Sequence, residues 1–116
     1  MTSPEKRLRT LLTQMRQTAD QAAAYVEGMS KDDFLADAKT QDAVIMKILV
    51  IGELAAKVLD HHPDFAAQHT QVRWQAMKGI RNRMAHGYFE LNLDTVWETV
   101  ETEIPKLLRD LQSLLP

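Results

Sequence analysis

An arginine, a histidine and a tyrosine lie close together in the segment 81–88, which reads RNRMAHGY. Arginine carries a permanent charge on a planar fork that fits phosphate oxygens, and histidine exchanges a proton near neutral pH. Without a metal, His86 could deprotonate the ribose 2′-hydroxyl of RNA or protonate the leaving 5′-oxygen, while Arg81 stabilised the charge at phosphorus. DNA lacks this hydroxyl, so the pair predicts cleavage of RNA and no action on DNA.

The same residues also have a purely structural interpretation. Basic side chains in the last turn of a helix complement the helix dipole, so the segment could simply terminate a helix. Arg81 and His86 are five residues apart, which separates them by about 140° around an ideal helix. They would converge only if the helix frays or ends at His86, or if a second subunit completes the site. Gly87 favours an end at His86, because glycine readily adopts the left-handed conformation that often follows a helix.

The composition is that of one folded domain, which we expect to span residues 1–116. The chain is 26% charged and 45% apolar, as ordinary globular proteins are. It has no cysteine, which excludes disulfides, thiolate nucleophiles and cysteine-based metal sites. Residues 1–7 lead into no apolar run typical of a signal peptide, so we expect a cytoplasmic protein.

The net charge of −2 is unevenly distributed. No acidic residue occurs between Asp64 and Glu90, whereas that stretch contains four positive charges, on Arg73, Lys78, Arg81 and Arg83. The rest of the chain is correspondingly more acidic. This asymmetry predicts a local site for anions on an acidic protein. It is too small for broad non-specific DNA binding, which needs many phosphate contacts.

Apolar residues recur at three- and four-residue spacing in every long segment, which is typical of amphipathic helices and not of strands. The sequence predicts helices from Pro4 to about Gly28, from Ser30 to about Ala38, from Thr40 to Leu59, from about Val72 to His86, and after Asn92 or Asp94. Pro105 lies inside the last helix and should kink it. The fold class is therefore all-α, a single antiparallel bundle of four to five helices with the last helix kinked near Pro105.

The segment 43–59 is apolar over most of its circumference, so it must be covered on more than one side. Its three charged residues and its length make a membrane helix a poor interpretation. We expect a central core helix that also contributes to a subunit interface. Glu53, on this otherwise apolar helix, is expected to be a structural partner of a buried arginine rather than an acid catalyst, and such a partner could position Arg81.

Other candidate residues have structural interpretations. His61 and His62 are adjacent and point apart, so they make a poor metal pair, and with His69 they are typical of a solvated loop. Trp74 and Trp97 are expected to be core or interface anchors. The chain lacks the Glu-x-x-His pairs of metal-binding bundles, so we expect no metal site.

Several motifs along the chain resemble those of a known family. The stretch from Trp74 to Leu107, with GIRNRMAHGY, then Asp94, VWETV and IPKLL, resembles the HepT-like branch of the HEPN proteins. The earlier KTQDAV at 39–44 and IGELAA at 51–56 resemble the central helix of that family. The likeness spans nearly the whole chain.

The resemblance implies a small helical dimer that acts as the toxin of a prokaryotic toxin–antitoxin module, encoded beside a minimal nucleotidyltransferase antitoxin. By the family signature, Arg81 and His86 are the metal-independent RNase pair, and Asn82 orients the site or the scissile phosphate. Tyr88 matches the tyrosine that the partner modifies with AMP, and the added bulk and negative charge should block RNA. The resemblance implies no cofactor, since only the partner uses ATP. Arg83 is either a phosphate-steering charge or a surface residue.

Two functions remain in view. The first is a cytoplasmic endoribonuclease toxin, a homodimer whose two copies of the segment 81–88 face one cleft and supply two imidazoles for acid and base roles. The second is a non-catalytic helical dimer that binds a nucleotidyltransferase or RNA as an interaction module. The intact Arg81 and His86 favour the first, because a scaffold has no need of that pair.

Overall fold

The structure, a computed structural model, describes residues 3–115, apart from the side chain of Tyr88. Within that range the chain is helical and has no strand, which confirms the predicted all-α bundle. The elements are α1 Pro4–Tyr25, α2 Lys31–Leu35, α3 Ala38–His61, α4 Pro63–Gln68, α5 Trp74–His86, the 3₁₀ turn η1 Tyr88–Glu90, α6 Leu93–Glu98, the π-helical turn η2 Thr99–Glu103 and α7 Ile104–Leu114.

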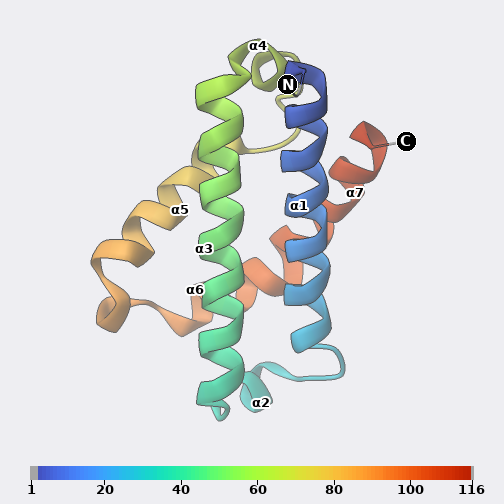
Figure 1. Cartoon of the computed structure of the whole chain (residues 1–116). Helices are drawn as coiled ribbons and strands as arrows, with labels where there is room; N and C mark the ends of the chain where they lie inside the picture. The colour runs from blue at the N-terminus through green and yellow to red at the C-terminus, as the bar shows by residue number, and fades with distance from the viewer. Residues whose placement is uncertain (1–2, 116) are drawn as a thin grey trace.

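The long helices α1 and α3 lie side by side, and α5 flanks α3 on the side away from α1 (Figure 1). α7 packs against α1. The core between these helices is built from the apolar residues that recur along each of them. Its fully buried large side chains are Met15, Phe34, Val44, Val58, Val100 and Leu111.

Side-chain caps decide where the first three helices begin. Ser3 accepts a hydrogen bond from the Lys6 amide at 3.1 Å, and Pro4 occupies the first turn of α1, as predicted. Ser30 and Asp33 form a reciprocal capping box at the start of α2. The chain between α1 and α2 turns at Gly28, whose φ of 78° is in the left-handed region.

Two boundaries differ from the prediction. The sequence predicted that α2 would reach Ala38 and that α3 would begin at Thr40, but α2 ends at Leu35 and α3 begins at Ala38. The reason is Asp37, whose carboxylate accepts bonds from the Thr40 amide at 3.0 Å and the Thr40 hydroxyl at 2.7 Å. These bonds make Asp37 the cap of α3, and they lower the pKa of its carboxyl below the usual range.

α3 is the central helix, as expected, because α1, α2, α4, α5 and α6 all pack against it. Nine of its residues are buried, including Val44, Ile48 and Ala55, while Met46 remains 57% exposed. No helix in the described range combines the length and apolar character that crossing a membrane requires.

The last helical segment bends, as predicted, and the bend includes a π-helical turn. Asn92 caps α6 by accepting from the Asp94 amide at 2.9 Å. The π-helical turn η2 then leads directly into α7, with Pro105 in its first turn. Proline has no amide hydrogen to donate, so an irregular turn just before it accommodates the lost bond.

Candidate functional site

The helix α5 carries most of the predicted site residues, and one side of it packs on α3. Trp74 and Met84 are buried, and Met77 and Ile80 are partly buried. The Trp74 indole donates to the carbonyl of His69 at 3.1 Å, which anchors the start of the helix. Trp74 is thus a core anchor, as predicted, although α5 begins there and not at Val72.

Gly52 brings α5 unusually close to α3. A β-carbon at this position would lie 2.4 Å from Cβ of Arg81 and 2.8 Å from the carbonyl oxygen of Met77, both far inside normal contact distance. Only glycine leaves room for this approach. The backbone of α3 at Gly52 therefore determines where the Arg81 side chain begins.

Glu53, the residue after Gly52 on α3, holds the guanidinium of Arg81. Nη1 of Arg81 donates to Oε1 of Glu53 in an ion pair, which confirms that Glu53 is the partner of an arginine. The Arg81 side chain is 22% exposed and that of Glu53 is 52% exposed, so the pair lies at the edge of the bundle. Nε of Arg81 is buried and has no hydrogen-bond partner within the described part of the protein.

His86 is the last residue of α5, and its side chain is exposed. The expectation of a left-handed glycine after it is wrong: Gly87 has φ −147°, a value open to any residue. The chain instead turns through η1, where the Glu90 amide donates to the Gly87 carbonyl at 3.0 Å. This turn redirects the chain after α5.

Arg81 and His86 lie on different sides of α5. The helix stays regular through His86, so Arg81 faces α3 while His86 lines a cavity next to α6. Among the described residues, no hydrogen bond or ion pair joins the two. Asn82 and Arg83 are both exposed, and the side chain of Tyr88 lies outside the described part of the structure.

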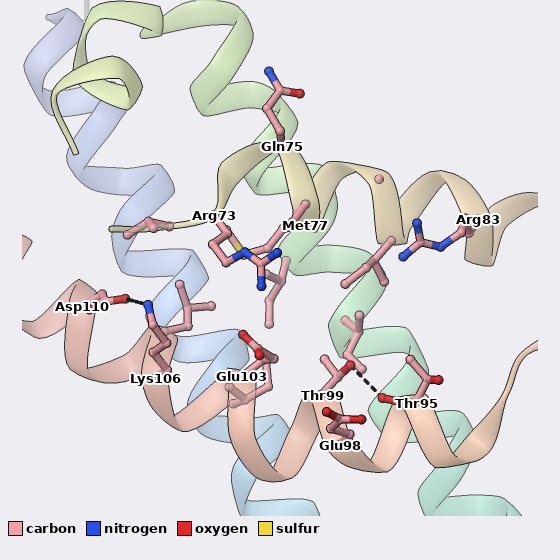
Figure 2. A pocket seen from close by; sticks show the side chains of 18 of the residues that line it. Arg73, Gln75, Met77, Arg83, Thr95, Glu98, Thr99, Glu103, Lys106 and Asp110 are labelled. Atoms are coloured by element: carbon pink, nitrogen blue, oxygen red, sulfur yellow. Dashed lines mark hydrogen bonds and ion pairs between the residues drawn. The ribbon is translucent and has the colours of Figure 1, made fainter. Parts of the chain in front are cut away.

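A cavity of about 500 Å³ separates α5 from the η2 and α7 segment (Figure 2). Arg73 and Arg83 line its α5 side, and Glu98 and Glu103 line the opposite side. At one end of the cavity, the Lys106 ammonium of α7 contacts Asp110 at 2.8 Å and donates to the Gln71 carbonyl at 3.0 Å. This bond links α7 to the loop before α5. The acid-free stretch between Asp64 and Glu90 therefore faces acidic residues from later in the chain, which sequence spacing did not show.

A second cavity, of about 440 Å³, lies beside the end of α5. It is lined by His86, Gly87 and Glu90 on one side and by residues of α6 on the other. Arg83 lines both cavities, so the two adjoin along α5. The sequence singled out Arg83 but had no signal for either cavity, because both depend on how far α5 stands from α6, η2 and α7.

The remaining candidates have structural surroundings. His69 lies between α4 and α5, is partly exposed and packs its ring on Phe65, with ring centres 4.4 Å apart. His61 is the last residue of α3, so the prediction of a loop is wrong for that residue. Trp97 packs on Phe34, with ring centres 5.3 Å apart. Within the described residues, no group of three or more His, Asp or Glu side chains is placed to hold a metal ion.

The chain is similar in sequence to proteins that are named as ribonucleases. The chain is 32% identical over 112 residues to "Putative RNase MJ0127" of Methanocaldococcus jannaschii, covering 97% of this chain and 90% of that one. It is 37% identical over 76 residues to "Probable ribonuclease HepT" of Thermococcus cleftensis, covering 66% of each. No solved structure matches the chain. The model of the family "Ribonuclease HepT-like" matches residues 15–114, so the chain belongs to the HepT-like ribonuclease family.

Proposed function

We propose that this protein is a metal-independent endoribonuclease in which Arg81 and His86 act on the scissile phosphate. The observation that carries the proposal is the position of Arg81. Its side chain is held by the close approach at Gly52 and by the ion pair with Glu53, at the edge of the bundle and within reach of solvent. The relatives named as ribonucleases support RNA as the substrate.

The proposed reaction is an internal transfer. The ribose 2′-oxygen attacks phosphorus and forms a 2′,3′-cyclic phosphate, while the bond from phosphorus to the 5′-oxygen breaks. An imidazole of His86 accepts the proton of the 2′-hydroxyl, and an imidazolium gives a proton to the leaving 5′-oxygen. The Arg81 guanidinium offsets the negative charge that develops on the phosphate oxygens. In this scheme Asn82, which is exposed and follows Arg81 directly, helps to orient the phosphate.

A homodimer would complete this site. Arg81 and His86 face different sides of one helix, and each chain has one copy of each. Two chains related by a twofold axis would place both copies in a shared cleft and supply separate acid and base imidazoles. Light scattering should show a dimer, and a stable monomer that keeps full RNase activity would contradict this part of the proposal.

Regulation by modification is the second part of the proposal. Tyr88 follows His86 by two residues, and a nucleotidyltransferase that adds AMP to its hydroxyl would bring bulk and negative charge to the site. This would make the protein the toxin of a toxin–antitoxin pair. Incubation with a minimal nucleotidyltransferase and ATP should add one adenylate, detected by mass spectrometry, and abolish cleavage. Tyr88→Phe should remain active and unmodified.

The test of the enzyme proposal is cleavage of RNA in EDTA. Arg81→Ala and His86→Ala should each lower the rate by about 100-fold or more, because each removes a group that acts in the transition state. Arg109→Ala and His61→Ala are matched controls, since both residues are remote from the segment 81–88 in the sequence and neither belongs to the proposed site. A wild type that does not cleave, or mutants equal to it, would instead favour a non-catalytic helical dimer that binds RNA or a nucleotidyltransferase.

A further inference from the structure

The smaller cavity, next to His86, has the shape and lining of a ligand site. Its volume of about 440 Å³ is in the range of small-molecule pockets. Ile80, Met84, Leu91 and Val96 contribute apolar side chains to its walls. Flat aromatic rings bind well to such surfaces, and the bases of single-stranded RNA are rings that can leave the stack and enter a pocket.

The polar lining of this cavity includes one cationic donor, Arg83, and one anionic acceptor, Glu90. Arg83 brings a guanidinium from α5, and Figure 2, which shows the larger cavity adjoining this one, labels its side chain on α5. Glu90 brings a carboxylate from η1, and one of its oxygens lies 3.8 Å from the point where a β-carbon of Gly87 would be. The carboxylate is therefore next to the residue that follows His86.

A carboxylate here indicates a base and not a phosphate as the occupant. Glu90 repels phosphate but accepts hydrogen bonds from the N–H groups of a base. The adjoining larger cavity carries both signs of charge, with Arg73 and Arg83 on one side and Glu98 and Glu103 on the other, so it offers no purely cationic site for the RNA backbone. The backbone would remain outside, near His86 and Arg81.

We propose that this cavity binds the base of the nucleotide on the 5′ side of the scissile phosphate, and that it selects guanine. The inference rests on the proposed ribonuclease function. Guanine alone among the four bases presents two adjacent donors, N1–H and the N2 amino group, together with the acceptors O6 and N7. Glu90 accepts from the two donors, and Arg83 donates to the acceptors, as arginine does in many base contacts.

Binding of single nucleotides tests the cavity without any cleavage. The four nucleoside 3′-monophosphates are titrated into wild-type protein, and the NMR shifts of the Leu91 and Thr95 amides are followed. Guanosine 3′-monophosphate should shift these amides and bind about tenfold or more tightly than the other three. Glu90→Gln should remove most of this preference. Glu101→Gln, which neutralises an exposed carboxylate on η2, should leave it unchanged.

The outcomes separate this inference from the proposed function. Equal binding of all four nucleotides, or a preference unchanged in Glu90→Gln, would overturn the guanine pocket. Protection of the same amides by dimer formation, without response to nucleotide, would show that a second copy fills the cavity and would also overturn it. Short RNAs that vary the base before the cleaved bond should be cut after guanine. If no RNA is cut but the guanosine preference holds, the ribonuclease proposal fails and the base site stands.

Discussion

The two sides of α5 differ in how closely they are packed. On the α3 side, Gly52 lets the backbones approach until Arg81 and Glu53 pair. On the α6 and α7 side, two cavities adjoin along the helix and Arg83 borders both. Close packing leaves a side chain few alternative positions, whereas an open side leaves room for a ligand. The same helix thus holds one arginine in place and offers another to solvent.

The ion pair on the packed side contributes to position more than to stability. A pair as exposed as that of Arg81 and Glu53 is typically worth about 0–1 kcal/mol. That is a small share of the stability of a domain. A displacement of about 1 Å at a catalytic group, in contrast, can lower a rate about 100-fold. We therefore expect Glu53 to act as a positioning residue for Arg81.

The largest effect on stability and activity should come from disrupting the close contact between α3 and α5 at Gly52. Gly52→Ala places a methyl group 2.4 Å from Cβ of Arg81, so α5 must move away from α3. Overpacking of this kind should cost about 1–3 kcal/mol and lower the melting temperature by roughly 5–10 °C, with loss of RNA cleavage. Thermal unfolding followed by circular dichroism measures the change.

Gly79→Ala is the matched control for this substitution. Gly79 is also a helical glycine, but nothing lies within 4 Å of a β-carbon there. The change should stabilise the protein by about 1 kcal/mol, since alanine favours helix more than glycine does. Equal melting temperatures for the two variants would show that the two helices are not in close contact at Gly52.

Removing the ion pair while leaving the packing intact should affect activity more than stability. Glu53→Gln keeps the shape of the side chain and removes the charge that holds Nη1 of Arg81. We expect kcat to fall about tenfold or more, with KM and the melting temperature little changed. Glu101→Gln, an equally conservative change at an exposed site, should match wild type. A Glu53→Gln enzyme with wild-type kcat would remove Glu53 from the mechanism.

Replacement of glycine by alanine should be tolerated at Gly87, after α5, but not at Gly28, after α1. Gly28 has φ 78°, so Gly28→Ala should cost about 1 kcal/mol. Gly87 has φ −147°, and the nearest atom to its β-carbon would be 3.4 Å away, so Gly87→Ala should change stability by less than about 0.5 kcal/mol. Urea titrations of both variants compare the two positions, and a larger loss for Gly87→Ala would mean that α5 ends in another conformation.

The smallest effect concerns the start of α3, where Asp37 caps the helix. Hydrogen bonds from Thr40 lower the pKa of Asp37, so the folded state favours its charged form. This contribution to stability is present above the ordinary pKa of the carboxyl and is lost as the pH falls through the lowered one. Asp37→Asn should therefore show a shallower loss of melting temperature on acidification than wild type. Parallel pH dependences would exclude Asp37 as a source of that loss.

The sequence predicted the architecture well because the signals are local. Three- and four-residue spacing marked the helices, Ser3 with Pro4 marked the first start, and Pro105 marked the bend. The start of α3 was misplaced because Asp37 was not considered as a cap, although aspartate is as good a cap as the asparagine that was correctly considered at Asn92. The left-handed Gly87 was wrong because a glycine after a helix permits that conformation without requiring it.

The sequence by itself identified the residue types of the candidate site, since the chemistry of a side chain follows from its type. It also predicted that Glu53 pairs with an arginine, since the apolar periodicity around Glu53 indicates a largely buried helix. Only the tertiary structure decided that Arg81 is that arginine and that Gly52 is what lets it approach. Those residues are nearly thirty positions apart, and their distance depends on how two whole helices pack. The cavities beside Arg83 and His86 have the same origin, because an open space between helices follows from their separation and leaves no pattern in the chain.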